Sequence, residues 1–230
     1  MISLCLTTYQ RTDLLFESFR QVIDDDRISE IVIVDDHSSM DYFNRVFEYT
    51  RSIPKVKLFR NEKNLDCYRN KREAVSKATN EWVILFDSDN ILTKEYVDAI
   101  CKQDFQKDTI LQPCAARPHF VFVKHSGLII DKHNVSVRID DGPFSTMLNA
   151  MNYFVNRDEF LRVWDGSVDP VTSDSLFQNY NWFKAGNSIY VVPGLEYEHR
   201  VHNGSHYQNN VRRTPQGFHD SIIQKLKELK

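Results

Sequence analysis

Short apolar runs that end in acidic residues dominate the first half of the chain. In Trp82–Asn90 the residues read WVILFDSDN, so that five apolar residues lead directly into two aspartates. Such a run indicates a strand buried on both faces, as in a parallel sheet covered by helices. The same pattern predicts a first strand at Ile2–Thr8, a second at Glu30–Asp36, which also ends in carboxylates, and a weaker third at Val56–Asn61.

Helical periodicity appears between and after these runs. Apolar residues with helical spacing predict helices over residues 12–23, 69–78, 94–103, 156–164, 173–184 and 217–230. Further short strands are predicted at 120–123 and 127–130, around a possible hairpin, and at 188–192, ending at Pro193-Gly194. The alternation of strands and helices in the first half is typical of βαβ units, so we expect an α/β fold with a mostly parallel sheet.

Composition narrows the function classes. The chain has 230 residues with 29 basic and 32 acidic side chains, a balance that gives no bias towards nucleic acid or another polyanion. Its four cysteines form no CxxC pair, which favours reduced thiols and a cytoplasmic protein. No basic leader precedes the first apolar run, and no apolar stretch approaches the roughly 20 residues of a membrane span.

Polar residues at the predicted strand ends suggest one ligand site. Thr7–Tyr9, Asp35–Ser38 and Asp87–Asp89 would converge beyond the carboxyl ends of parallel strands, where open α/β sheets bind ligands. Only 7 glycines are present, and neither GxGxxG nor GxxxxGK[ST] occurs, so a bound phosphate needs another partner. Paired carboxylates can supply it by holding Mg²⁺ together with substrate phosphates. Alternatively, Asp89 caps a helix that starts near Leu92.

Four motifs in order carry a resemblance to a known family. The segments TTYQR, EIVIVDDHS, NLDCYRNKREA and EWVILFDSD resemble those of GT-A fold glycosyltransferases of the large inverting family 2. The resemblance implies a GT-A (nucleotide-diphospho-sugar transferase, Rossmann-like) mixed sheet flanked by helices. It also implies metal-dependent transfer of a sugar, with inversion, from a nucleoside diphosphate sugar to a glycan hydroxyl. A UDP-sugar is favoured, a GDP- or dTDP-sugar is possible, and the cofactor is Mn²⁺ or Mg²⁺.

The same resemblance divides the chain. We expect a single GT-A domain over residues 1–230, with a nucleotide-sugar-binding half (1–90), an acceptor and catalytic half (91–216) and a C-terminal helix (217–230). A segment within Arg200–Arg213 is expected to close over the donor and exclude water.

Donor contacts are expected mainly from the first half. A carboxylate can accept the imide N–H of a uracil and a tyrosine ring can stack on its face. The alternative is that Asp35 and Asp36 cap a turn and that Tyr9 packs in the core. A basic residue near Asn64 should meet the base or diphosphate, as in the family motif N-x-G-x-x-x-A-R-N, with Arg69, Lys71 and Arg72 all eligible. The predicted donor residues are Thr7, Tyr9, Arg11, Asp36, Arg69, Arg72, Asp87 and Ser88.

Metal and catalytic residues follow from the same comparison. Asp87, Asp89 and His202 are the expected metal ligands, Asp89 being the surer carboxylate, and a histidine ligand favours Mn²⁺. Inversion needs a base that takes the proton of the acceptor hydroxyl, and Asp174 is the expected base, with Asp169 in reserve. Asp174 could equally act as the N-cap of the helix that it opens.

Acceptor contacts and other enzyme classes remain open. Aromatic rings can stack on the apolar faces of sugars, and imidazoles can form hydrogen bonds with sugar hydroxyls. The candidate acceptor contacts are therefore Trp164, Trp182, His119 and His125. Alternatively, the two tryptophans are core residues. A nucleotidyltransferase that makes a nucleotide sugar, or a non-catalytic module that binds a sugar nucleotide or glycan, are the alternative functions. The first of these normally has a glycine-rich loop after its first strand, which TTYQRTDLL lacks.

Overall fold

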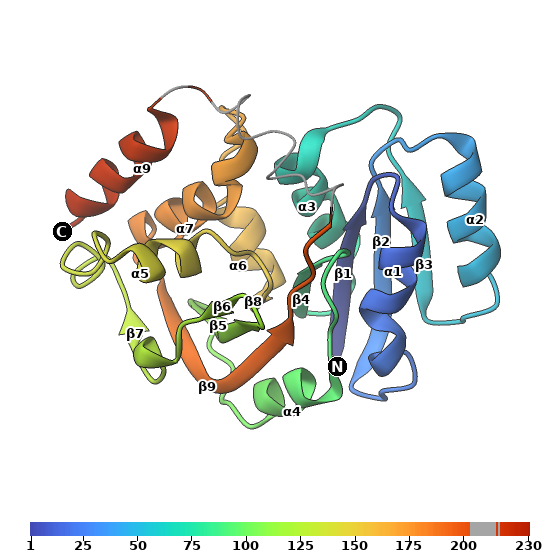
Figure 1. The fold of residues 1–230 in the computed structure, drawn as a ribbon, viewed down its shortest axis with the longest axis horizontal. Helices are drawn as coiled ribbons and strands as arrows, with labels where there is room; N and C mark the ends of the chain where they lie inside the picture. The colour runs from blue at the N-terminus through green and yellow to red at the C-terminus, as the bar shows by residue number, and fades with distance from the viewer. Residues whose placement is uncertain (203–214, 216) are drawn as a thin grey trace.

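One continuous sheet of nine strands organises the protein (Figure 1). The computed structural model describes residues 1–202, 215 and 217–230. The strands are β1 (Ile2–Thr8), β2 (Ile28–Asp35), β3 (Val56–Arg60), β4 (Trp82–Asp87), β5 (Thr109–Arg117), β6 (Phe120–Val121), β7 (Ile129–Ile130), β8 (Tyr153–Asn156) and β9 (Ser188–Glu198). The α-helices are α1 (Thr12–Phe19), α2 (Met40–Thr50), α3 (Asp66–Lys77), α4 (Lys94–Cys101), α5 (Gly142–Leu148), α6 (Arg157–Arg162), α7 (Asp174–Lys184) and α9 (Phe218–Lys227). Short 3₁₀ helices are η1 (Arg20–Val22), η2 (Val123–His125) and η3 (Val171–Ser173).

The strand order creates a crevice at the carboxyl ends. The order is β3-β2-β1-β4-β8-β5-β9-β7, with β6 paired to β5, and the first four strands are mutually parallel. The chain moves outwards from β1 to β3 and then returns to the other side of β1 with β4. Ligands bind where the strand order reverses in this way. The mixed, mostly parallel sheet flanked by helices confirms the predicted fold class.

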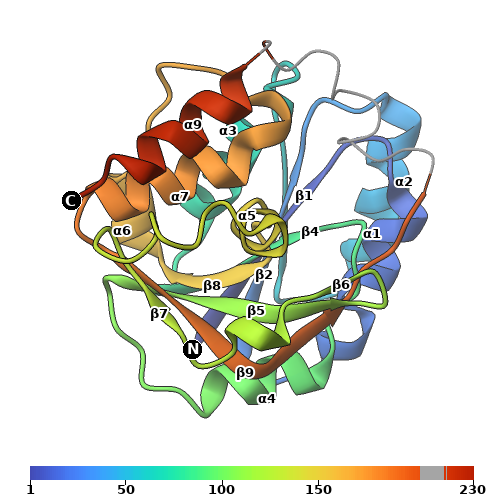
Figure 2. The same cartoon turned by 60° about the vertical axis from the view of Figure 1, so that its left-hand side comes forward.

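Both faces of the central strands are buried, which explains their unbroken apolar sequence. In β1, Leu4 and Leu6 belong to a core cluster that includes residues of α1, α2 and α4. The intervening Cys5 belongs to a second cluster, which contains residues of α3, α5, α6, α7 and α9. Figure 2 shows α3, α6, α7 and α9 gathered on one side of the sheet, away from α1, α2 and α4. Alternate side chains thus enter two different cores, and neither face can be polar.

Four helices and strands of the structure were not predicted: α2, α5, β5 and β8. Helix α5 has only seven residues, too few for a helical period to emerge, and begins with Gly142-Pro143. Helix α2 was missed because it buries only Val46 and Thr50. Its remaining residues are wholly or partly exposed. Strand β5 is interrupted by Gln112 and Pro113, and its pairing with β9 shifts register between Pro113 and Ala115. Strand β8 has only four residues, too few for a pattern to emerge.

One expected strand pairing and one expected strand end were wrong. The strands predicted at 120–123 and 127–130 do not pair as a hairpin, because β6 pairs with β5, β7 pairs with β9 and η2 separates them. The strand predicted to end at Pro193-Gly194 continues to Glu198. The register shift against β5 accommodates this continuation, with Gly194 at a φ of 75°.

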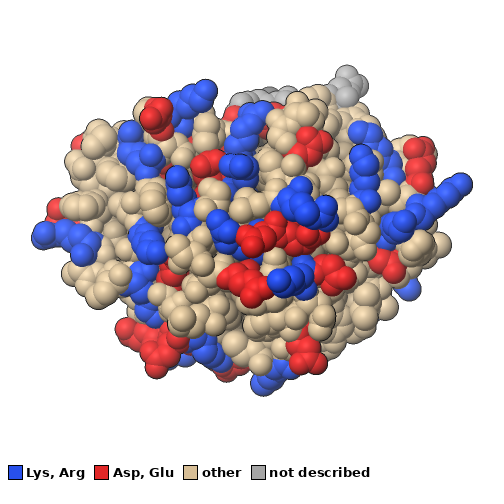
Figure 3. Space-filling model, turned by 180° about the vertical axis from the view of Figure 1, so that it is seen from behind, with Lys and Arg blue, Asp and Glu red and all other residues tan. Residues whose placement is uncertain are grey.

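Charges on the face opposite to that of Figure 1 alternate in sign. Figure 3 shows basic and acidic side chains next to one another there, with no extended patch of either sign. None of the helices within residues 1–202 and 217–230 is long and apolar enough to cross a membrane.

Glu30 joins three strands at the end of the sheet away from the crevice. The residue is 3% exposed, and its carboxylate accepts hydrogen bonds from Ser3 Oγ (2.5 Å), Lys57 Nζ (2.5 Å) and Thr79 N (2.8 Å). Burial alone would raise the pKa of Glu30, but these donors favour the ionised form and hold the pKa below its ordinary value. A depressed carboxyl pKa stabilises the fold at neutral pH, and this contribution disappears as pH falls through the lowered value.

Glu30→Gln tests this network. At pH 7 we expect the variant to lose about 2–3 kcal/mol of unfolding free energy, because hydrogen bonds to a buried charge are replaced by weaker ones. The deficit should begin to shrink at the ordinary glutamate pKa, where the unfolded chain takes up the proton, and should be lost once pH falls through the lowered pKa of folded Glu30. Urea unfolding at pH 7 and at pH 3–4 measures both effects. Glu62→Gln, at an exposed position, is the matched control, and a deficit independent of pH would contradict the assignment.

Candidate active site

A cavity of about 950 Å³ lies at the carboxyl ends of β1, β2 and β4. Helices α3, α5 and α7 and the residues after β9 complete its walls. The predicted site residues that line it are Thr7, Tyr9, Arg11, Asp36, Asp87, Ser88, Asp89 and Asp174. Arg69, Arg72, Trp164, Trp182 and His119 do not contribute to this lining. The strand-end residues therefore converge as the sequence predicts, whereas most of the predicted basic and acceptor residues lie elsewhere.

The two aspartates after β2 have separate surroundings. Asp35 accepts a hydrogen bond from Ser38 N (2.9 Å) and holds the turn. Asp36 accepts bonds from Asn61 Nδ2 and Leu65 N, both 2.8 Å, at Oδ1, and burial raises its pKa. Asp36 Oδ2 has no partner among the described residues, so one carboxylate oxygen is available to a ligand.

Tyr9 is 46% exposed and lines the cavity. The alternative that this ring packs in the core is therefore excluded. An exposed aromatic face beside Asp36 is suited to stacking on a nucleobase.

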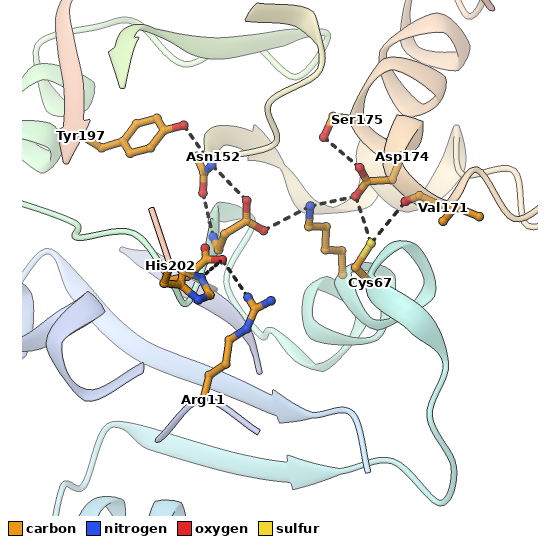
Figure 4. A network of polar contacts seen from close by, with 11 residues as sticks. Arg11, Cys67, Asn152, Val171, Asp174, Ser175, Tyr197 and His202 are labelled. Atoms are coloured by element: carbon orange, nitrogen blue, oxygen red, sulfur yellow. Dashed lines mark hydrogen bonds and ion pairs between the residues drawn. The ribbon is translucent and has the colours of Figure 1, made fainter. Parts of the chain in front are cut away.

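Asp87 is fixed by an asparagine that sequence analysis missed (Figure 4). Asn152 Oδ1 accepts a bond from Asp87 N (2.7 Å), and Asn152 Nδ2 donates to Asp87 Oδ2 (3.1 Å) and to Tyr197 Oη (3.2 Å). Tyr96 Oη donates in turn to the Asn152 carbonyl (2.8 Å). Asn152 lies just before β8 in no motif, so the sequence offers no signal for it.

A buried lysine connects the two walls of the cavity. Lys71 Nζ lies 2.9 Å from Asp174 Oδ2 and 3.2 Å from Asp87 Oδ1. Burial works to lower the pKa of Lys71, but the two carboxylates outweigh it and raise the pKa well above its ordinary value. Lys71 is thus a charged ammonium. Asp174 is held by this ammonium, with the Cys67 thiol 3.6 Å from the same oxygen. The N-cap position of α7 is occupied by Ser173, so Asp174 is the first residue of the helix and not its cap.

The backbone at Asp66 favours Lys71 as the basic residue that matches the family motif. Asp66 has a φ of 62°, the left-handed conformation that glycine adopts most easily. If Asp66 occupies the glycine position of N-x-G-x-x-x-A-R-N, the arginine position falls on Lys71. Arg69 instead lies 3.9 Å from Asp169 at the surface, and Arg72 pairs with the neighbouring Glu73. The expectation that Arg69 and Arg72 contact the donor is not supported, because neither lines the cavity and each is paired with an acidic residue.

Asp89 receives two basic groups at one oxygen. Arg11 Nη1 lies 2.8 Å and His202 Nε2 3.1 Å from Asp89 Oδ2 (Figure 4). Although burial alone would raise it, the pKa of Asp89 is lowered by the His202 hydrogen bond and the Arg11 charge. Helix α4 begins at Lys94 and is capped by Thr93, whose Oγ1 accepts from Tyr96 N. Asp89 is therefore not the helix cap that the alternative interpretation required.

The donor set around Asp89 fits a divalent cation completed by substrate. Within the described ranges no three acidic, histidine or cysteine side chains form a cluster that could enclose a metal ion. Mg²⁺ typically uses only one or two carboxylates and takes its remaining ligands from phosphates and water. Asp89 and His202 provide a carboxylate and an imidazole at one point of the cavity edge. The Asp87 carboxylate, in contrast, is engaged by Asn152 and Lys71.

Arg200 holds the turn that carries these aspartates, and sequence analysis missed it. Its guanidinium donates to the carbonyls of Asp89 (2.6 Å) and Leu14 (2.7 Å) and pairs with Glu17 Oε2 (2.6 Å). One side chain thereby ties α1 to the turn after β4. The only sequence signal for Arg200 is its position two residues before the expected metal ligand His202.

Backbone strain gathers around the cavity. Gln10, His37, Asp66 and Val171 are the residues other than glycine that have positive φ in the described part of the chain. Each follows a strand of the crevice or precedes a helix that lines it. Val171 is β-branched, for which a φ of 50° is a genuine outlier. Strain of this kind, about 1–3 kcal/mol each, is typical of functional sites.

The alternative base Asp169 and three of the acceptor candidates make contacts that belong to the fold and not to the cavity. Asp169 accepts a bond from Val171 N (3.1 Å) and does not line the cavity. Trp182 is fully buried and donates to the Ser188 carbonyl (2.7 Å), so it is a core residue and not an acceptor contact. Trp164 stacks on Tyr68 at 3.7 Å between ring centroids, and His125 is buried against Phe144.

His119 lies at the edge of the cavity. Its Nδ1 is 3.0 Å from Nδ1 of His199, which does line the cavity. Other residues that line the cavity and that sequence analysis did not predict include Phe120, Phe122, Ser145, Thr146, His199 and His219. Of the segment expected to close over the donor, residues 203–213 lie outside the described residues.

Comparison with known proteins places this site in a family. The family described as glycosyl transferase family 2 matches residues 3–117, half of the chain. A search of curated proteins finds no match. Residues 3–117 include the strands β1, β2 and β4 and the residues Asp36, Lys71, Asp87 and Asp89.

Solved structures with the same fold extend the likeness beyond the matched half. A mannosyltransferase from Pyrobaculum calidifontis, in complex with GDP-Man and Mn²⁺, superposes with a TM-score of 0.66 at 15% identity, over 98% of this chain and 68% of that one. S. aureus TarS 1-349 in complex with UDP-GlcNAc gives 0.69 at 19% identity, over 90% and 60%. At such identities the likeness concerns the fold. Together with the family match, it shows that this chain belongs to glycosyl transferase family 2 and is a glycosyltransferase with a GT-A fold.

Proposed function

We propose that this glycosyltransferase is metal-dependent and transfers a sugar from a nucleoside diphosphate sugar to a glycan hydroxyl with inversion, using Asp174 as the base. A UDP-sugar is the favoured donor, and GDP- and dTDP-sugars are compatible. Structures of similar fold contain UDP-GlcNAc in one case and GDP-Man with Mn²⁺ in another. Both support a nucleotide-sugar donor in the cavity described above.

The observation that carries the proposal is the shared ammonium of Lys71. Asp87 follows the donor-side strand β4, and Asp174 opens α7 on the opposite wall. Lys71 lies within 3.2 Å of both carboxylates. A base for an inverting displacement must face the donor from the acceptor side, and this bridge fixes a carboxylate there.

Each remaining group has a role in the proposed reaction. Asp36 Oδ2 accepts the imide N–H of the base, and the Tyr9 ring stacks on it. Asp174 takes the proton of the acceptor hydroxyl while that oxygen bonds to the anomeric carbon and the bond to the diphosphate breaks. Asp89 and His202 hold the cation, which when bound supplies Lewis-acid stabilisation of the charge on the departing diphosphate. Arg11, close to Asp89, adds positive charge at the same place.

The two other function classes are less compatible with these findings. Membership of glycosyl transferase family 2 favours sugar transfer over nucleotide-sugar synthesis and over simple binding. The products distinguish the classes directly. A transferase releases a nucleoside diphosphate, a nucleotidyltransferase releases pyrophosphate, and a binding module releases neither.

Donor class and metal dependence can be tested together. Thermal unfolding is measured with UDP, GDP, dTDP and their sugars, with and without Mn²⁺. Ligand at 100 times Kd stabilises the native state by about 2.7 kcal/mol, which for 150–250 residues raises the midpoint by several degrees. We expect one nucleotide to produce this shift only with metal.

Asp89→Asn should abolish that metal-dependent shift, because it removes the charged ligand. Asp26→Asn, at an exposed position on a loop distant in sequence, is the control and should retain it. Failure of every nucleotide to move the midpoint under any metal would contradict the proposed donor class.

Asp174→Asn tests the base. We expect acceptor-dependent turnover to fall about 10²- to 10⁴-fold, the usual contribution of a positioned base, while the nucleotide-induced midpoint shift persists. Nucleoside diphosphate release with and without acceptor measures the first effect. Asp169→Asn is the matched control, and turnover that survives in Asp174→Asn but not in the control would transfer the role to Asp169.

Lys71→Met and Lys71→Arg separate charge from position. Without the ammonium, Asp87 and Asp174 lose the counter-ion that they share, so Lys71→Met should lose about 3–5 kcal/mol of stability. Lys71→Arg retains the charge with a different shape. We expect it to restore most of the stability but to remain about 10²-fold slower, because displacements of about 1 Å have that effect on rate. Urea unfolding and kcat check the two quantities, and full activity in Lys71→Met would exclude a positioning role.

A further inference from the structure

Phe120 lines the cavity from β6, an element that carries none of the predicted nucleotide contacts. The residue is 39% exposed although it lines the cavity. It belongs to β6, a strand of two residues that pairs with Ala115 and Ala116 at the end of β5. A large apolar side chain left exposed within a concave site indicates a surface that a ligand covers.

Neighbouring rings hold Phe120 in place. Phe122 lies nearly parallel to it, with ring centroids 6.3 Å apart and an interplanar angle of 9°. The ring of His199 meets Phe120 edge-on at 5.0 Å, and His119 supports His199 through the contact between their Nδ1 atoms. Phe120 is therefore preorganised as a flat apolar surface, which reduces the entropy lost when a ligand stacks on it.

The rest of this side of the cavity is almost uncharged. We define the acceptor wall as the cavity-lining residues within 116–122, 145–151 and 172–175. Among these lining residues, all of which the structure describes, Asp174 is the one with a formal charge; Lys71, His199, Arg200 and His219 also line the cavity but lie outside the three ranges. Arg117, which lies within the first range, does not line the cavity and pairs with Glu196.

Hydroxyl groups give the acceptor wall a preference for hydrogen-bond donors. Ser145 Oγ and Thr146 Oγ1 both donate their protons to the Gly142 carbonyl, at 3.0 and 2.9 Å. Their oxygen lone pairs are then left to accept hydrogen bonds from a ligand. A sugar ring combines an apolar face with outward hydroxyl donors. A phosphorylated or carboxylated ligand would bring a further anion next to Asp174, whose counter-ion Lys71 is already shared with Asp87.

We propose that the acceptor is a neutral sugar that stacks an apolar ring face on Phe120 and turns the reacting hydroxyl towards Asp174. This inference rests on the proposed function, because it assigns the acceptor of the same transfer. The platform consists of Phe120 with Phe122 and His199 around it. It selects the acceptor by ring shape and neutrality, whereas the donor residues on β1, β2 and β4 are not involved.

Methyl glycosides of neutral hexoses and N-acetylhexosamines, compared with the 6-phosphates of the same sugars, are the acceptor probes. Product formation is followed by nucleoside diphosphate release and mass spectrometry. The variants are Phe120→Ala, Phe120→Tyr, which keeps the ring, and Val123→Ala, an exposed position nearby that does not line the cavity. Donor hydrolysis without acceptor and the nucleotide-induced midpoint shift are measured in parallel.

We expect Phe120→Ala to raise the acceptor KM about three- to tenfold, the effect of losing one aromatic contact. Donor hydrolysis and the midpoint shift should stay within twofold of wild type. Phe120→Tyr and Val123→Ala should behave like wild type, and phosphorylated acceptors should be poorer substrates than their neutral counterparts.

Three results would overturn the proposal: an unchanged acceptor KM in Phe120→Ala, a preference for the phosphorylated acceptors, or donor hydrolysis without transfer to any neutral glycoside. Failure of the proposed function looks different. In that case the wild-type enzyme neither binds nor hydrolyses any nucleotide sugar, and the acceptor role of Phe120 falls with it.

Discussion

The buried ammonium of Lys71 is the interaction on which the arrangement of the site depends. A lysine inside a protein normally loses its charge, because burial disfavours the ionised form. Here two carboxylates from elements far apart in the sequence compensate that cost, Asp87 after β4 and Asp174 at the start of α7. Without the lysine, both carboxylates would lose their shared counter-ion. One ion triad therefore joins the half of the chain matched by the family to the half that is not.

The site around this triad is built from polar strand ends instead of glycine-rich loops. Asn152 and Arg200 bind the backbone of the Asp87–Asn90 turn from two sides. Residues other than glycine adopt left-handed backbone conformations at four bends beside the cavity, including Asp66 and Val171. Such bends are unfavourable in isolation and persist when surrounding contacts hold them. The hydrogen bonds that hold the turn and the strained backbone of the loops therefore both belong to a rigid site.

The sequence predicted the parts of this site that local patterns encode. Apolar runs ending in acids located β1, β2 and β4, and their carboxyl ends converge as parallel strands must. Arg69 and Arg72 were favoured over Lys71 because three neighbouring basic residues look alike until the backbone at Asp66 is known. Asn152 is absent from every motif, because its role depends on the pairing of β8 with β4. The contacts between segments that are distant in the sequence could not be predicted, because the local spacing of apolar residues carries no information about them.

The length of strand β9 fixes the spacing between the core at Trp182 and the turn of Asp89. It starts at Ser188, whose carbonyl binds the Trp182 indole in the core, and after eleven residues releases the chain at Glu198, beside the turn of Asp89. Successive side chains alternate between faces, so a gain or loss of one residue would exchange the faces of everything beyond it. His202 would then no longer reach Asp89. During divergence, changes in chain length should therefore accumulate in the loops around β6 and β7, where they would reshape the acceptor wall without moving Asp89 and His202.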